Sequence, residues 1–381
     1  MSEFHLFSET FKALLREKQG ISGMRLLGSI YSQHKLIMVK QLFLLSMVTL
    51  SSLVASAENF YINPKTGNDK NPGSQSLPLK TIGEAGKRIN ASTAKEATAI
   101  ILSEGVYALT ETVLFTNTTF SAENRLTIRA ELLPDDPDWS PQRMPIITAV
   151  IPAAPTPGDG EEARGLEIEA SHVTIAGLRF TGSPVYYYID GKQNRRYYPI
   201  WRDGKNLDDL VVSQCLFAGN VDVLPIRVAV IGNGHGLVLD HCVFYNCQNP
   251  VVFWNAQEGS SSRNAMRYCL VYEANYSGVW TTAQTGDDFE FHHNIIAKSR
   301  TAWIRDDDST HHYQIHDCIL ADNAKTTGNG GDIAINNDFL KMENVQFSGV
   351  IEIERDQSKH NYLQLKEGSL GSTLRAGLFK R

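Results

Sequence analysis

The sequence lacks a strong excess of one charge and the motifs of nucleotide-dependent or zinc-dependent enzymes. Its 42 acidic and 36 basic residues give a net charge of −6, which argues against a surface for nucleic acid or an anionic membrane. It contains no phosphate-binding loop, dinucleotide fingerprint, serine nucleophile elbow or zinc-ligand spacing. We therefore expect no nucleic-acid partner, and we look for function outside the enzyme classes that these motifs mark.

A span long enough for a membrane helix is also missing. The apolar run at 42–54 is shorter than the roughly 20 residues that such a helix needs. Lys35 and Lys40 precede it, and Ala55-Ser56-Ala57 follows as a small-residue cleavage site, a pattern typical of a secretory signal. We expect a signal at 38–57, with a buried helix or a membrane anchor as the alternatives. The mature chain would begin near Glu58, carry no membrane span and be secreted to the periplasm, the cell surface or the medium. Residues 1–37 are expected to be a non-structural or mis-assigned extension, with Met38 as a possible true start.

Cysteine is scarce and odd in number. Five cysteines exclude a complete disulfide framework. Four of them share one position of a repeat, and equivalent residues of stacked coils lie about 4.8 Å apart, which leaves disulfides geometrically open. Buried free thiols are the common case for cysteine. We therefore expect an inward ladder of free thiols, and no metal site, because thiols spaced one per coil lie in a line.

The sequence does contain a short motif that recurs through its second half. Its landmark residues are Cys215, Cys242, Cys269, Asn294 and Cys318, which are separated by 27, 27, 25 and 24 residues. The full copies are LVVSQCLF (210–217), LVLDHCVF (237–244), NAMRYCLV (264–271), FEFHHNII (289–296) and YQIHDCIL (313–320), with weaker copies at 173–180 and 340–347. Apolar and polar residues alternate within each copy, as in a strand with one buried face. A strand that recurs at this step predicts a solenoid of stacked coils.

The N-terminal part of the expected mature chain supports a particular solenoid. A strand around Tyr61-Ile62 precedes Gly67-Asn68-Asp69, Asn71-Pro72-Gly73 and Pro78-Leu79-Lys80-Thr81-Ile82, and residues 81–90 are expected to form a short capping helix. Gly105-Val106-Tyr107 and residues 365–369 complete this set of segments. This combination resembles exported proteins of the pectate-lyase-like superfamily. The resemblance implies an all-β, right-handed parallel β-helix over 58–371, with 372–381 as a C-terminal tail. It carries little information about function, because enzymes and non-catalytic adhesins share the fold.

Tryptophan is concentrated in one segment of each coil. Four of the five tryptophans, Trp201, Trp254, Trp280 and Trp303, lie in the segments expected to form the first sheet. If they point outward, stacking of the coils makes them one aromatic stripe on which a saccharide can stack. Strand alternation favours Trp280 and Trp303 outward, while Trp201 and Trp254 are ambiguous. The alternative is that the rings fill the core.

Charged residues accompany the tryptophans. Cleavage of an acidic polysaccharide by β-elimination needs a cation that neutralises the uronate carboxylate and a base that takes the C5 proton. Arg305, Arg202 and Lys205 are the catalytic candidates, and Asp306, Asp307 and Asp308 are candidate Ca²⁺ ligands, with a solvated turn as the alternative. Arg195, Arg196 and Tyr198, in an insertion that lengthens one coil, are further substrate-binding candidates.

We therefore expect an exported, monomeric carbohydrate-active β-helix whose partner is a polysaccharide. A lyase acting on a uronate-containing polymer is the first expectation. A non-catalytic carbohydrate-binding or adhesin-type protein is the alternative, and a glycoside hydrolase is third.

Overall fold

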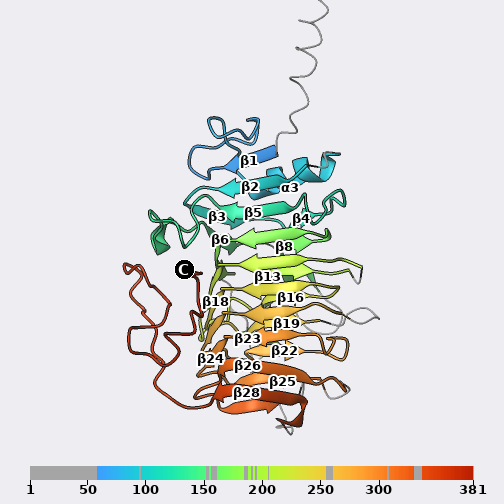
Figure 1. Cartoon of the computed structure of the whole chain (residues 1–381). Helices are drawn as coiled ribbons and strands as arrows, with labels where there is room; N and C mark the ends of the chain where they lie inside the picture. The colour runs from blue at the N-terminus through green and yellow to red at the C-terminus, as the bar shows by residue number, and fades with distance from the viewer. Residues whose placement is uncertain are drawn as a thin grey trace, which may run out of the picture. The chain divides into compact units, whose positions relative to one another are not determined.

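The chain forms three parallel β-sheets that wind around one apolar core (Figure 1). The computed structural model describes residues 58–380 except 94–95, 152–153, 156–160, 184–187, 190–191, 194, 205, 255–260, 307–308 and 330–336. The predicted signal and the residues before it lie outside these ranges. The predicted right-handed parallel β-helix with an N-terminal capping helix is confirmed. No helix within the described ranges is both long and apolar enough to cross a membrane.

A full coil contributes one stretch of strand to each sheet. Sheet 1 contains β4 (Val113–Phe115), β8 (Glu161–Ile168), β13 (Arg195–Arg202), β16 (Val228–Gly232), β19 (Asn249–Phe253), β22 (Val279–Thr281), β25 (Thr301–Arg305) and β27 (Lys325–Gly328), with β7 (Ala154–Pro155) antiparallel to β8. Sheet 2 contains β1 (Glu58–Ile62), β2 (Thr98–Leu102), β5 (Leu126–Ala130), β9 (Val173–Ala176), β14 (Leu210–Ser213), β17 (Leu237–Asp240), β20 (Ala265–Arg267), β23 (Glu290–His292), β26 (Tyr313–Ile319) and β28 (Leu340–Gln346). Sheet 3 contains β3 (Val106–Leu109), β6 (Ile146–Ala149), β10 (Arg179–Gly182), β15 (Leu216–Ala218), β18 (Val243–Tyr245), β21 (Leu270–Tyr272), β24 (Ile295–Ala297) and the end of β26. The connections between these strands contain a small antiparallel pair, β11 (Tyr188–Ile189) and β12 (Lys192–Gln193). They also contain the 3₁₀ turns η1 (Pro141–Arg143) and η2 (Asn337–Phe339).

The landmark residues mark the corner between sheets 2 and 3. The strand register aligns Ser213, Asp240, Arg267, His292 and His316, so the landmarks two positions later stack on one another. The residue just before each landmark has a left-handed backbone, with φ of 52° at His241 and 53° at His293. This single left-handed residue turns the chain sharply, and the next side chain then points into the core.

The landmark cysteines form the expected ladder of thiols. All five cysteines are free and buried, which confirms that prediction. Burial raises the pKa of Cys318 to about 12, and it also raises the pKa of Cys247. Thiolate is the reactive form of cysteine, so we expect the folded protein at about pH 8 to leave Ellman's reagent unreacted. Unfolding in guanidinium should release all five thiols, and fast reaction of the folded protein would contradict the inward ladder.

Asn294 takes the place of cysteine in one coil and joins that coil to the one before it. Its side chain is fully buried, donates to the Met266 carbonyl at 2.6 Å and accepts from the Cys269 amide at 2.9 Å. Asn294→Ala leaves both backbone groups buried without a partner. We expect the free energy of unfolding to fall by about 2–4 kcal/mol, measured by urea denaturation. A loss below about 0.5 kcal/mol, the range of a neutral surface change, would show that water replaces the amide.

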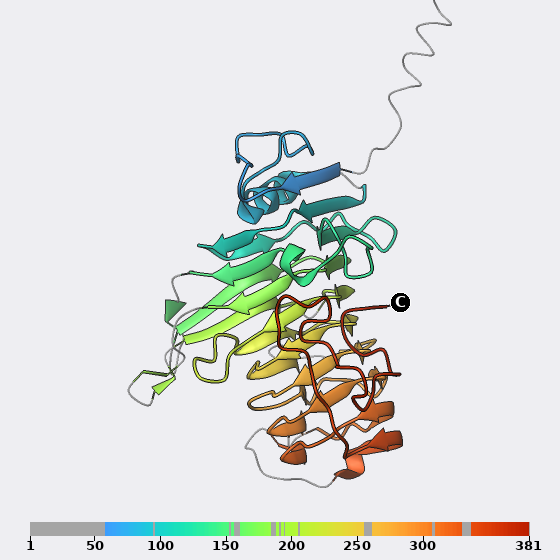
Figure 2. The same cartoon turned by 90° about the vertical axis from the view of Figure 1, so that its left-hand side faces the viewer.

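The ends of the solenoid are covered differently. Helix α3 (Ile82–Ala91) begins after Thr81, whose side chain accepts from the Glu84 amide. The buried face of the helix packs near β4. At the other end, residues 347–380 do not simply close the last coil. They run back along the outer side of sheet 3 (Figure 2), where Ile351, Leu363 and Leu378 pack against the outward-facing apolar residues of that sheet. Part of the expected tail is therefore packed against the solenoid, and Leu378 is fully buried.

Candidate functional site

Three of the four tryptophans lie on the outer face of sheet 1. The register places Trp201, Ile231, Val252 and Trp280 in one column across four coils. Together with Tyr198, Val228 and Trp254 they form an apolar cluster separate from the core, which we call the outer strip. Trp254 and Trp280 remain partly exposed, whereas Trp201 is buried, with only 7% of its surface exposed. The strip offers aromatic faces of the kind on which sugar rings stack.

Trp303 does not belong to the strip, which corrects the outward placement expected for it. Its side chain is fully buried, and its register partner is the core residue Val279. Val279 follows its landmark Cys269 by ten residues, whereas Trp303 follows Asn294 by nine. One residue fewer in the connection moves Trp303 to the inward position, because successive strand residues face opposite sides.

Charged residues of β8 border the strip at its N-terminal end. The Arg164 guanidinium lies 4.0 Å from the Trp201 ring centre and pairs with Glu162 at 2.8 Å and with Glu167. Tyr198 packs edge-on against Trp201. Sequence reasoning missed Arg164, because only the β8–β13 register, across a long insertion, shows that the two strands are neighbours. Arg196 is partly buried on β13, and the side chain of Arg195 lies outside the described part of the structure.

The proposed catalytic arginines lie away from the strip. The register puts Arg202 and Arg305 in one column, next to the outward column of Trp201, so alternation turns both toward the inner side. Arg202 is buried, with only 1% of its surface exposed, and it donates to the His235 carbonyl at 2.9 Å. Burial lowers its pKa to about 10, although Asp208 and Asp209 act in the opposite direction. Such a buried cation cannot reach a chain lying on the strip.

Arg305 is engaged in a similar way. Its guanidinium donates to the His311 carbonyl at 3.1 Å and lies 4.4 Å from the Phe339 ring centre. Four coil steps separate it from Arg202, which is about 19 Å at the stacking distance, so the two cannot act on one bond. Among the candidate Ca²⁺ ligands, Asp306 accepts from the Trp280 indole at 2.9 Å. Lys205, Asp307 and Asp308 lie outside the described residues.

A hollow of about 460 Å³ opens at the corner between sheets 3 and 1. Three of its residues, Asn246, Glu273 and Lys298, have left-handed backbones with φ of 51–58°, so the same turn recurs in successive coils. We call this the corner hollow, and it is lined by Val221, Asn246, Glu273, Ala274, Asn275, Lys298 and Arg300. Sequence reasoning did not single out Glu273, Lys298 or Arg300 as site residues.

The corner hollow is rich in cationic side chains. A hydrogen bond to the Tyr272 hydroxyl at 2.7 Å raises the pKa of Lys298, so this residue is a cation at neutral pH. Arg300 is exposed, and its guanidinium lies 5.6 Å from the Tyr276 ring centre. Glu273 pairs with Arg355 at 2.7 Å. The hollow can therefore attract an anionic group and hold it beside a carboxylate.

Tyr276 links the corner hollow to the outer strip. Its ring centre lies 5.7 Å from that of Trp280, and the guanidinium of Arg300, which lines the hollow, lies on its ring as well. A path of aromatic rings thus leads from the strip to two cations. The path combines surfaces for sugar rings with groups for carboxylates.

Comparisons with known proteins bear on the fold alone. No protein-family model matches the chain, and no curated protein matches its sequence. Among solved structures, a lacto-N-biosidase from Eubacterium ramulus has a TM-score of 0.45 at 8% identity, over 79% of this chain and 70% of that one. A rhamnogalacturonan lyase has a TM-score of 0.38 at 13% identity, over 83% and 96%. A pectin methylesterase from Aspergillus niger has a TM-score of 0.36 at 12% identity, over 85% and 95%.

Proposed function

We propose that this protein binds an acidic polysaccharide across the outer strip and the corner hollow. The observation that carries the proposal is the unbroken path from Trp280 through Tyr276 to Arg300 and Lys298. Sugar rings stack on the aromatic faces, and uronate carboxylates pair with the cations. Such polymers occur outside cells, which agrees with the signal expected at 38–57.

The reaction that this site favours is β-elimination. Lys298 and Arg300 neutralise the uronate carboxylate, which makes the C5 proton more acidic. A base takes that proton, the electron pair of the C5–H bond forms the C4–C5 double bond, the bond from C4 to the bridging oxygen breaks, and the leaving oxygen takes a proton from water or from the protonated base. Glu273 is the carboxylate beside the two cations and fills the role of base. Lys298 does not, because its raised pKa keeps it protonated. In this proposal, the two cations neutralise the uronate carboxylate, which is the role that we expected Ca²⁺ to fill.

Hydrolysis fits the hollow less well. Glycoside hydrolysis uses two carboxyl groups about 5–9.5 Å apart, and Glu273 is the sole carboxylate among the described residues that line the hollow. Non-catalytic binding uses the same surface and needs no base. Only a product measurement separates binding from elimination.

The test is a screen of the protein against polygalacturonate, alginate and glycosaminoglycans, with and without Ca²⁺. Elimination gives ultraviolet absorbance from the unsaturated uronate, whereas hydrolysis gives reducing ends without it. We expect absorbance with at least one polymer and its loss in Glu273→Gln. Absorbance that survives in that variant would remove Glu273 as the base, and binding without product would leave the carbohydrate-binding function alone.

A further inference from the structure

The corner between sheets 2 and 3 carries a column of ring side chains on its outer side. His241, Tyr268 and His293 occupy the left-handed position of successive coils, and Asp317 occupies it in the next. The ring centres of His241 and Tyr268 are 4.7 Å apart, and those of Tyr268 and His293 are 4.8 Å apart. The corner backbone therefore holds side chains of consecutive coils at a fixed, short spacing.

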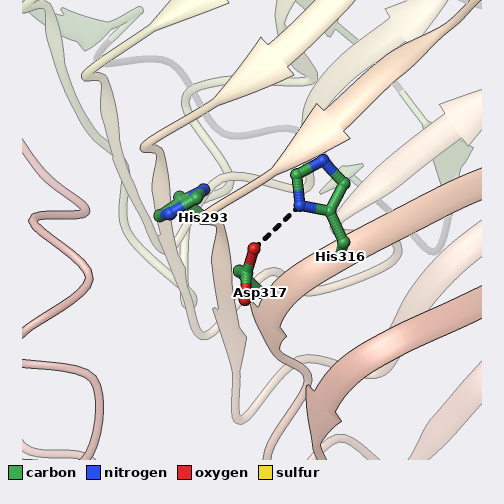
Figure 3. A group of neighbouring side chains, drawn as sticks. All are labelled: His293, His316 and Asp317. Atoms are coloured by element: carbon green, nitrogen blue, oxygen red, sulfur yellow. Dashed lines mark hydrogen bonds and ion pairs between the residues drawn. The ribbon is translucent and has the colours of Figure 1, made fainter.

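At the C-terminal end of this column, two histidines and one carboxylate meet. His293, His316 and Asp317 surround one small space (Figure 3), and one potential ligand atom from each lies within 4.8 Å of the others. His316 Nδ1 is 2.9 Å from Asp317 Oδ2. Two ligands of one ion are about 3.0–3.4 Å apart when each bond is about 2.1 Å, so this pair is already at nearly that separation. To close the site, the ligand atom of His293 must approach this pair from a distance of at most 4.8 Å.

Neighbouring groups orient these side chains. Asn344, from the following coil, donates to Asp317 Oδ1. His292 lies between Glu290 and His293, with Nε2 2.7 Å from Glu290 Oε1 and Nδ1 2.9 Å from His293 Nδ1. An ionised carboxylate only accepts, so His292 Nε2 carries a proton. When His292 also accepts at Nδ1 from the Nδ1–H of His293, the lone pair of His293 is on Nε2, and such outer contacts are typical of metal ligands.

We propose that His293, His316 and Asp317 bind a divalent first-row transition-metal ion of the zinc type. Two imidazoles and one carboxylate suit such ions, whereas magnesium and calcium prefer oxygen ligands alone. The ligands come from adjacent coils, so the ion joins these coils near the C-terminal end of the solenoid. Binding displaces the proton that His316 shares with Asp317. Water completes the coordination, because His316 and Asp317 are 47% and 36% exposed.

The corner supplies conservative variants for a test. His293→Asn introduces the residue found at the same corner position at 344, and asparagine tolerates the left-handed backbone. Asp317→Asn keeps the hydrogen-bonding shape without the charge. His172→Asn is the matched control, because His172 also has a left-handed backbone, with φ of 60°, and lies 3.0 Å from a carboxylate of Asp209.

The experiment titrates Zn²⁺ into the full chain after treatment with chelator, followed by calorimetry. We expect one ion per chain, an affinity at least about tenfold lower in His293→Asn and Asp317→Asn, and no change in His172→Asn. Absence of binding by the wild type, or unchanged affinity in both ligand variants, would overturn the proposal.

A second measurement needs no variant. Co²⁺ added to the wild type should give visible bands of a nitrogen- and oxygen-coordinated ion. Bands from thiolate coordination would place the ion at a cysteine instead and would also overturn the proposal.

Discussion

Replacing Trp303 by alanine is expected to lower the free energy of unfolding by about 3–5 kcal/mol. The side chain is fully buried, and its ring centre is 4.8 Å from that of Phe291 and 5.5 Å from that of Tyr313. Its indole nitrogen donates to Thr281 at 3.0 Å. Removal leaves a large cavity bounded by rings that cannot close it, and the buried Thr281 hydroxyl loses its indole partner. Urea denaturation followed by far-ultraviolet circular dichroism measures the loss.

Trp280→Ala is the matched control, since it removes the same side chain from the neighbouring strand of the same sheet. Trp280 is partly exposed and belongs to the outer strip, so we expect a loss below about 1.5 kcal/mol with weaker binding of polysaccharide. A larger loss of stability in Trp280→Ala than in Trp303→Ala would show that the two side chains are placed on the wrong faces.

The second large effect is expected from the double variant Lys298→Ala, Arg300→Ala. Each charge-assisted hydrogen bond contributes about 1.5–3 kcal/mol, and about 1.4 kcal/mol corresponds to tenfold in affinity. Loss of both cations should therefore weaken binding of an acidic polysaccharide about 100-fold or more. The wild-type affinity should fall with added salt. It should persist up to about pH 9, because the pKa of Lys298 is raised and arginine stays charged.

The control for this double variant removes the same two charges elsewhere. Lys87 and Arg143 are exposed and form the surface pairs Lys87–Glu111 and Arg143–Glu104, each worth at most about 1 kcal/mol. Lys87→Ala, Arg143→Ala should bind the polysaccharide nearly as well as the wild type. Equal weakening in both double variants would mean that net charge, and not the corner hollow, governs binding. A loss of affinity near pH 6.5 would instead point to histidine.

The repeat made the fold predictable from the sequence. The spacing of Cys215, Cys242 and Cys269 placed one strand in each coil, and alternation around each landmark predicted that the thiols point inward. The structure confirms both points, because the left-handed residue before each landmark is a local feature that repeats with the sequence. The capping helix was also predictable from local signals, since Thr81 is a good helix N-cap.

The site was less predictable, because it depends on contacts between coils. Alternation assigns faces only when the connection lengths are known, and one residue fewer before Trp303 reversed its orientation. The same alternation that places Trp201 on the outer face turns Arg202 toward the inner side. The corner hollow combines Glu273, Lys298 and Arg300 from two coils, and none of these stands in a motif. Packing of residues 347–380 on sheet 3 also leaves no periodic signal.

The most direct test of the proposed binding surface compares two forms of one polymer. Polygalacturonate carries a carboxylate on each sugar, and its fully methyl-esterified form has the same backbone without the charge. Affinity electrophoresis of the full chain should show retardation by the charged polymer, none by the ester, and none in Lys298→Ala, Arg300→Ala. The same comparison with alginate and a glycosaminoglycan covers other uronates. Equal retardation by charged and esterified polymer, or none by any acidic polymer, would contradict the binding of uronate in the corner hollow.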